Sequence, residues 1–204
     1  MLVVNFATKH YLPGQRRLKA SVQPYECLTF DQYSQIGSPT QQESPYQFKI
    51  HAIEKALDKD DIVLWCDASL WRVGDLSIIE NIIKEEGFFG EESGHHCWNW
   101  ANDHCRQYHN LTKEEGLIMY SAGLTGINKN NPTAMEFLRQ WKASALAGCF
   151  KGDYSNHRHD MVNASIIAQR LGLKFQRGGT HLSYIGEGYA KPSDTAIFYL
   201  QGML

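Results

Sequence analysis

A regular alternation of strand-like and helix-like segments in the first 87 residues limits the fold more than any other feature of the chain. Apolar runs without helical spacing predict three strands, at residues 2–7, 25–30 and 61–66. Apolar residues spaced three or four apart predict helices over 15–22, from Ser44-Pro45 to Ala56, and from Leu76 to a stop near Gly87. Strands that alternate with helices indicate an α/β fold with a mostly parallel central sheet flanked by helices.

The second half of the chain is less regular. Residues 87–116 mix glycines, aromatics and histidines, which predicts an irregular excursion over the sheet with one short helix near 99–108. A strand broken at Gly123 is predicted over 117–129, and helices are predicted from Pro132 onward and over 160–173. Residues 174–204 are predicted to form a tail of short strands and turns.

The composition indicates one soluble domain over residues 1–204. With 43% hydrophobic and 21% charged residues, a chain of 204 residues buries a substantial core. A net charge of −2 gives no electrostatic reason to expect nucleic acid or a membrane surface as partner, so we expect a polar small molecule. We find no transmembrane run and no signal peptide, and five dispersed cysteines fit reduced thiols, so we expect a cytoplasmic protein.

The third predicted strand ends in an acid. In DDIVLWCDASLW, residues 60–71, an apolar run meets Asp67, and the small residues Ala68 and Ser69 follow. Ligands of open α/β sheets bind outside the carboxyl ends of parallel strands. We therefore expect Asp67 to face a crevice, with Ala68 and Ser69 small enough to admit a ligand and a metal ion. The alternative is that Asp67 forms a turn or caps a helix, as strand-terminal aspartates often do.

Five segments resemble, in the same order, the landmarks of nucleotide-sugar glycosyltransferases of the GT-A fold. They are FATKHY, VLWCDAS, SAGLTGI, RHDMVN and GYAKP, and they extend from the first strand to Pro192. The likeness is nearest to the glycogenin and bacterial lipopolysaccharide galactosyltransferase group. It implies a Rossmann-like GT-A fold and transfer of a sugar from a UDP-sugar to a glycan, lipid-linked or protein acceptor. It also implies that 87–116 and 174–204 carry donor-site or acceptor-site residues.

The resemblance implies a role for individual residues as well. In the first two segments the implied nucleotide or metal contacts are Ala7, Thr8, Tyr11, Asp67, Ala68 and Ser69. Tyr11 would stack on uracil, and Asp67 would hold a divalent ion at the DxD motif, where Ser69 replaces the second acid. In the later segments the implied donor contacts are Ser121, Ala122, Gly123, Asp160, Asn163, Gly188 and Lys191. His181 would be a third metal ligand, and Lys191 would meet the diphosphate.

Glycosyl transfer explains why such residues would gather. A departing nucleoside diphosphate develops negative charge, which a cation neutralises, and carboxylate and phosphate oxygens suit Mn²⁺ or Mg²⁺. Lys49, on the helix before the strand of Asp67, is a further donor-site candidate, or else a solvated helix residue. Asp160 is expected to contact the donor sugar, to act as a base if the reaction inverts, or to cap a helix. The resembling group retains configuration.

Other functions stay open at this stage. The segment HRHD offers His157, His159 and Asp160 as ligands of a metal-dependent hydrolase. The serine at position 69 also fits a catalytically silent sugar-nucleotide or glycan binder. The excursion supplies zinc-ligand types without a common zinc spacing, namely His95, His96, Cys97, His104, Cys105 and His109. In the same stretch, Trp98 and Trp100 are candidates for stacking on sugar rings or for anchoring the core.

Overall fold

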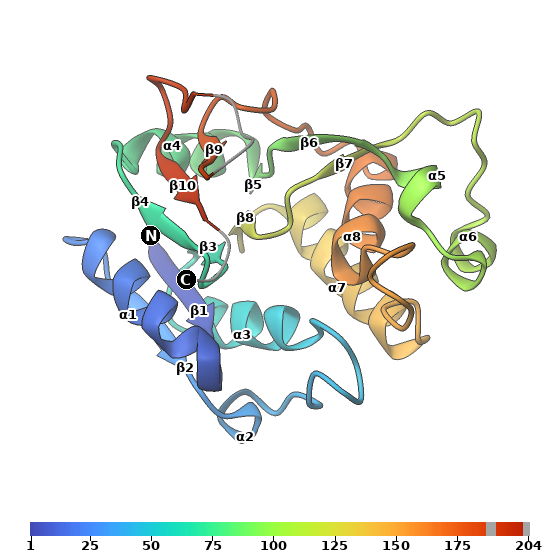
Figure 1. Cartoon of the computed structure of the whole chain (residues 1–204), viewed down its shortest axis with the longest axis horizontal. Coiled ribbons are helices and arrows are strands. Elements are labelled where there is room, and N and C mark those ends of the chain that lie inside the picture. The colour runs from blue at the N-terminus through green and yellow to red at the C-terminus, as the bar shows by residue number, and fades with distance from the viewer. Residues whose placement is uncertain (187–190, 202–204) are drawn as a thin grey trace.

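The computed structural model describes residues 1–186 and 191–201, and its centre is a five-stranded sheet in the order β2-β1-β3-β8-β5 (Figure 1). Its strands are β1 (Leu2–Phe6), β2 (Cys27–Phe30), β3 (Ile62–Cys66), β5 (Phe88–Phe89) and β8 (Leu124–Asn128). β1 is parallel to β2 and β3, while β8 is antiparallel to both β3 and β5. Only β8 therefore runs against the other strands of this sheet, and the predicted mostly parallel sheet is confirmed.

Helices cover both faces of the sheet, in agreement with the predicted α/β architecture. The described helices are η1 (Lys9–Tyr11), α1 (Leu12–Ser21), α2 (Tyr33–Ile36), α3 (Phe48–Leu57), α4 (Ser77–Glu86), α5 (Cys97–Trp100), α6 (Asp103–His109), α7 (Pro132–Leu146) and α8 (His159–Arg170). Alternate residues of β3 point to opposite faces, which places Val63 and Trp65 in one core and Leu64 and Cys66 in the other. Because both faces are buried, β3 is an uninterrupted apolar run.

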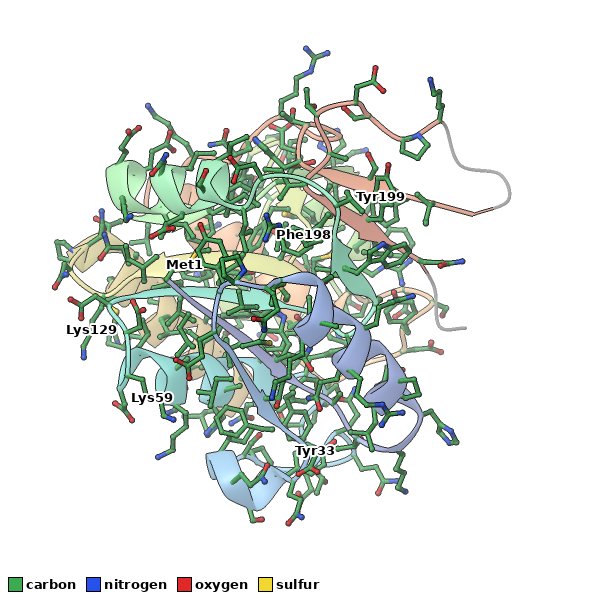
Figure 2. All side chains as sticks on the ribbon, turned by 90° about the vertical axis from the view of Figure 1, so that its left-hand side faces the viewer. Met1, Tyr33, Lys59, Lys129, Phe198 and Tyr199 are labelled. Atoms are coloured by element: carbon green, nitrogen blue, oxygen red, sulfur yellow. The ribbon has the colours of Figure 1, made fainter. Side chains whose placement is uncertain are left out.

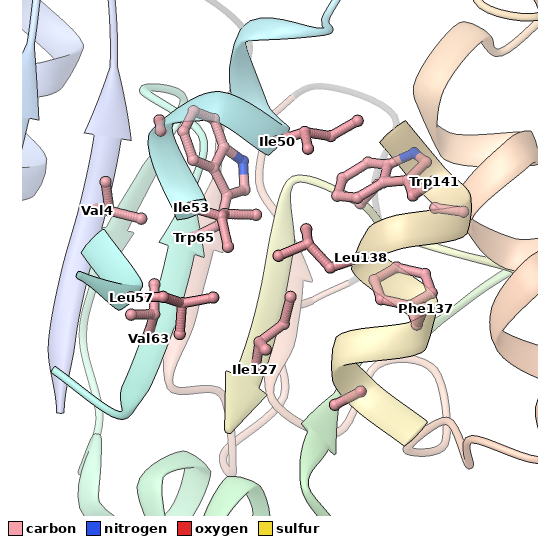
Figure 3. Close-up of a cluster of buried hydrophobic side chains, with 14 of the residues drawn as sticks. Val4, Ile50, Ile53, Leu57, Val63, Trp65, Ile127, Phe137, Leu138 and Trp141 are labelled. Carbon is pink, nitrogen blue, oxygen red and sulfur yellow. The ribbon is translucent and has the colours of Figure 1, made fainter. Parts of the chain in front are cut away.

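The larger core lies between the sheet and the helices α3 and α7. Figure 3 shows Ile50 of α3, Trp65 of β3 and Trp141 of α7 converging there, and all three are at most 1% exposed. The second core packs α1 and α4 against the opposite face through Leu18, Ile79 and Ile83. Together the two cores fix the ends of the strands, where ligands of such sheets bind.

Two smaller sheets flank the central one. β4 (Leu70–Arg72) pairs antiparallel with β10 (Phe198–Leu200), which pairs parallel with β9 (Leu182–Tyr184). β6 (Glu92–His96) pairs antiparallel with β7 (Ile118–Tyr120). In Figure 2, Tyr199 of β10 and Tyr33 of α2 lie on opposite sides of the molecule.

Two predicted elements differ from the structure. The helix expected from Ser44-Pro45 begins only at Phe48, because Tyr46 has a left-handed backbone with φ of 60° and interrupts the turn. The excursion contains α5 and α6 instead of one helix. Extended backbone at Ala101 ends α5, and the side chain of Asn102 caps α6 by accepting from the N–H of Cys105.

Two further observations concern the expected environment of the protein. All five cysteines are buried and free, as expected for reduced thiols. In the ranges 1–186 and 191–201 no helix combines the length and apolar character needed to cross a membrane.

Candidate active site

The carboxyl ends of β1 and β3 meet at one edge of the sheet because the two strands are parallel. A chain of buried hydrogen bonds holds them there. Gln15 of α1 donates to Oδ1 of Asn5 at 2.9 Å, and Asn5 Nδ2 donates to the carbonyl of Cys66 at 2.6 Å. Ala7 and Asp67, the residues after the two strands, therefore lie next to the same space.

That space is a cavity of about 250 Å³ beside Asp67. The predicted residues that line it are Ala7, Thr8, Tyr11, Lys49, Asp67, Ala68 and Ser69. Five more lining residues were not predicted from the sequence as contacts, namely Phe6, Tyr33, Gln41, Tyr46 and Phe48. The expectation that Asp67 faces a crevice is met, and the sequence segments FATKHY and VLWCDAS come together here.

A buried ammonium group organises the floor of this cavity. Lys49 is 4% exposed, and its Nζ lies 3.1 Å from Asp67 Oδ1 and 2.9 Å from Asp160 Oδ2. The carbonyl of Ala122 lies 3.5 Å from the same nitrogen. The alternative of Lys49 as a solvated helix residue is therefore wrong, and we call Asp67, Lys49 and Asp160 the ionic cluster.

Burial and charge act in opposite directions on this cluster. Burial alone lowers the pKa of Lys49, but the carboxylates of Asp160 and Asp67 outweigh it and raise the pKa above its usual value. Burial also raises the pKa of Asp160, and Lys49 offsets part of that rise. Burial, followed by the charge of Asp160, raises the pKa of Tyr46 to about 12. At neutral pH, Lys49 is therefore a fixed positive charge below the cavity.

Asp160 lies in the first turn of α8 and does not cap it, because Arg158 is the N-cap residue. Its carboxylate points to Lys49, and Oδ2 accepts no hydrogen bond from any other described residue. The indole of Trp141 donates to its backbone carbonyl at 3.1 Å. Asp160 thus lies behind Lys49 as seen from the cavity.

Asp67 is partly exposed but already has partners inside the protein. The indole Nε1 of Trp65 donates to Oδ1 at 2.8 Å, and Lys49 approaches both carboxylate oxygens. Its backbone N–H donates to the carbonyl of Gly123 at 2.8 Å. A Cβ on Gly123 would lie 2.9 Å from Asp67 Oδ2, so glycine leaves the room that this carboxylate occupies.

A larger cavity of about 630 Å³ adjoins Ser121, the first residue of the segment SAGLTGI. Ser121 and Lys191 line it, together with Glu91, Arg177 and residues of β9. Ala122 contacts Lys49 and Gly123 contacts Asp67, so the predicted residues 121–123 run between the two cavities. Gly188 lies outside the described residues.

Two predicted residues have buried structural partners. Asn163 donates from Nδ2 to the carbonyls of Cys149 and His159, and its Oδ1 lies 2.8 Å from His109 Nε2. His181 Nδ1 lies 3.0 Å from Glu91 Oε2. Glu91, 1% exposed, also accepts from the backbone N–H of Thr180 and Leu182.

The expected metal ligands do not fit a divalent-metal site as they lie. The carboxylate of Asp67 accepts from Lys49 and Trp65, and His181 is buried beside Phe89 and is not among the described residues that line the cavity at Asp67. Within residues 1–186 and 191–201, no group of three or more His, Cys, Asp or Glu side chains is arranged to hold a metal ion.

The hydrolase ligand set is not assembled either. His157 Nδ1 accepts from the N–H of Asn102 at 3.2 Å, and Nε2 donates to the carbonyl of Cys149 at 2.8 Å. His159 bonds the carbonyl of Phe150 through Nδ1 at 2.8 Å. These histidines tie the loop before α8 to its surroundings. The zinc ligands considered in the excursion likewise form no such group among the described residues.

The tryptophans of the excursion are partly covered. The guanidinium of Arg106 lies 4.3 Å from the ring centroid of Trp98, and that of Arg158 lies 3.9 Å from that of Trp100. Trp98 also lines a small cavity of about 180 Å³.

Comparisons with known proteins agree with this architecture. No family model and no curated protein matches the chain. The apo structure of mouse xyloside xylosyltransferase 1 is similar at a TM-score of 0.56 and 12% identity, covering 97% of this chain and 96% of that one. A glycosyltransferase involved in glycosylation of the major capsid of PBCV-1 gives a TM-score of 0.60 and 10% identity, covering 98% of this chain and 91% of that one. Apo WbbM, a bifunctional glycosyltransferase, gives 0.55 and 11%, covering 93% of this chain but 40% of that one.

At these identities the likeness shows the fold. The chain has the GT-A fold of nucleotide-sugar glycosyltransferases, as the order of its sequence segments predicted. The nearer likeness to the glycogenin group stays a prediction.

Proposed function

We propose that this protein is a glycosyltransferase that moves a sugar from a nucleoside-diphosphate donor, a UDP-sugar, to an acceptor hydroxyl. The observation that carries the proposal is the ionic cluster of Asp67, Lys49 and Asp160, which lies under a cavity at the carboxyl ends of β1 and β3. Ligands of open α/β sheets bind at this edge. The fold of its neighbours supports the same class of reaction.

The lining of the smaller cavity suggests how the donor lies. Tyr11 and Tyr33 offer aromatic faces for a base, and Thr8 offers a hydroxyl. Ala68 and Ser69 have small side chains where the diphosphate would pass close to the backbone. The sugar would then reach Lys49 and Asp67, and residues 121–123 would lie between it and the larger cavity, which we assign to the acceptor.

The reaction breaks the bond between the anomeric carbon and the phosphate oxygen, and the electron pair leaves with the diphosphate. The acceptor oxygen bonds to the anomeric carbon, and its proton passes to the departing diphosphate. Fixed positive charge lowers the barrier to such a step without reorganisation. Lys49 provides that charge, and Asp160 positions Lys49 from behind. A bound Mn²⁺ or Mg²⁺ would supply similar stabilisation, but Asp67 already accepts from Lys49 and Trp65, and His181 is not among the described residues that line the cavity at Asp67.

Donor turnover tests the proposal directly. Purified protein is incubated with a panel of UDP-sugars, and release of UDP is measured alongside donor affinity by calorimetry. We expect binding and slow release of UDP. We expect Asp67→Ala to lose donor affinity at least about tenfold, because Asp67 holds the Lys49 ammonium at the cavity and without it Asp160 draws that charge away from the donor. The exposed Asp58→Ala is the matched control. Equal donor affinity in the Asp67→Ala variant and the parent rejects the assignment, and binding without release supports a silent binder.

A further inference from the structure

We propose that this protein binds the diphosphate of its donor without a divalent ion, and that the guanidinium of Arg17 supplies the positive charge in its place. This inference rests on the proposed function, and it concerns only how the diphosphate is neutralised. It starts from the disagreement between the metal site implied by the sequence and the ligands found in the structure.

The first reason is that Asp67 already serves an internal cation. Both of its oxygens lie within 3.3 Å of Lys49 Nζ, and Oδ1 also accepts from Trp65. A divalent ion bound to the same carboxylate would face an ammonium that is held in place by Asp160 as well. Two like charges at one carboxylate repel each other, so Lys49 and a metal ion compete for Asp67.

The second reason is the chemistry at Ser69, the last residue of the Asp67-Ala68-Ser69 segment. Ser69 supplies a neutral hydroxyl where the DxD motif has an acid, and its backbone carbonyl accepts from the N–H of Gln201 at 3.3 Å. Arg17 Nη2 donates to the same carbonyl at 3.3 Å. A cationic group therefore already lies at Ser69, directly beside the expected path of the diphosphate.

The surroundings of Arg17 hold its guanidinium in place. Its central carbon lies 4.1 Å from the ring centroid of Trp71, so the planar group stacks on the indole. Its buried Nε has no hydrogen-bond partner in the part of the chain that the structure describes. Arginine recognises phosphate through such a planar fork, which can donate two hydrogen bonds to one phosphate.

The cavity next to Arg17 joins this cation to the donor site. It measures about 230 Å³, and no carboxylate is among its described lining residues, which are His10, Tyr11, Pro13, Gly14, Arg17, Ala68 and Ser69. Tyr11, Ala68 and Ser69 also line the cavity above Lys49. A nucleotide that lies along these shared residues therefore has Lys49 near one end of its diphosphate and Arg17 near the other.

Nucleotide titration tests the inference. UDP is titrated into the protein by calorimetry, once with EDTA and once with Mn²⁺, and ADP, CDP and GDP are tested in parallel. We expect the dissociation constant for UDP to differ less than threefold between the two conditions. Binding at least tenfold tighter with Mn²⁺ overturns the inference while leaving the proposed function intact. If no nucleoside diphosphate binds in either condition, the proposed function fails and this inference fails with it.

Variants of Arg17 separate a phosphate contact from a structural role. Arg17→Met should weaken UDP binding at least tenfold and leave uridine binding unchanged, because uridine has no phosphates. The exposed neighbour Arg16→Met is the matched control and should keep the parent affinity for UDP, and Arg17→Lys should fall between. Equal losses of UDP and uridine affinity in Arg17→Met would show that Arg17 only shapes the pocket, and would overturn its assignment.

Discussion

Replacing Lys49 with methionine removes the only cation that contacts the buried carboxylate of Asp160 among the described residues. The side chains of Lys49 and Asp160 are 4% and 6% exposed, so water cannot compensate for the loss. Breaking a buried ion pair by removing one partner costs about 3–5 kcal/mol of folding free energy. For a domain of this size, that corresponds to a fall in Tm of roughly 6–20 °C.

A second lysine provides the matched control. Lys142 lies 2.7 Å from Glu54, closer than Lys49 lies to Asp160, but these side chains are 35% and 37% exposed. Exposed pairs contribute about 0–1 kcal/mol, so Lys142→Met should have little effect on stability. The comparison separates burial from distance as the source of the energy.

Urea unfolding followed by circular dichroism measures both variants. The double variant Lys49→Met with Asp160→Asn should recover part of the loss, with a coupling energy of about 2 kcal/mol or more. Burial raises the pKa of Asp160, and without Lys49 its charge destabilises the folded state increasingly as pH rises through that pKa. The loss of unfolding free energy in Lys49→Met should therefore be smaller at pH 5 than at pH 8. If Lys49→Met costs no more than Lys142→Met, or if the two substitutions in the double variant are additive, the reasoning is refuted.

Two further predictions concern other buried groups. Burial disfavours the protonated imidazole of His157 and lowers its pKa, so the folded protein loses stability as pH falls below the usual histidine pKa. The free energy of unfolding of His157→Gln should therefore vary less between pH 7.5 and 5 than that of the parent, and equal pH dependence would contradict this. All five cysteines are buried, and burial raises the pKa of Cys27 to about 11 and that of Cys97 to about 12. None should react with a thiol reagent until the protein unfolds, and rapid labelling of the native protein would contradict this.

The sequence predicted the first half of the fold closely because its strands are uninterrupted apolar runs separated by helices with one apolar stripe. It did not predict the start of α3. Ser44-Pro45 has the composition of a helix start, and the left-handed backbone of Tyr46 leaves no mark in the residue type. β6 was missed because its residues are mostly exposed and polar, and only its pairing with the distant β7 makes it a strand.

The candidate site was predicted unevenly for a similar reason. Asp67 follows a buried strand, which is a local signal. The burial of Lys49 has a local signal in its helical spacing. Ile53 and Ala56, four and seven residues later, share its helical face and are buried with it. Arg17 and Glu91 have no such local signal, because their partners are distant in the sequence. Arg17 bonds to Ser69, and Glu91 bonds to His181.

The pairing of β10 with β4 has a consequence for how the protein is made on the ribosome. Residues 198–200 clamp the strand directly after Asp67-Ala68-Ser69, and Gln201 reaches the carbonyl of Ser69. A nascent chain can form the parallel strands of its main sheet long before these residues emerge from the exit tunnel. Clamping of the loop at the proposed nucleotide site therefore comes after formation of the main sheet, and a chain that lacks β10 would keep most of its core but leave this loop unclamped.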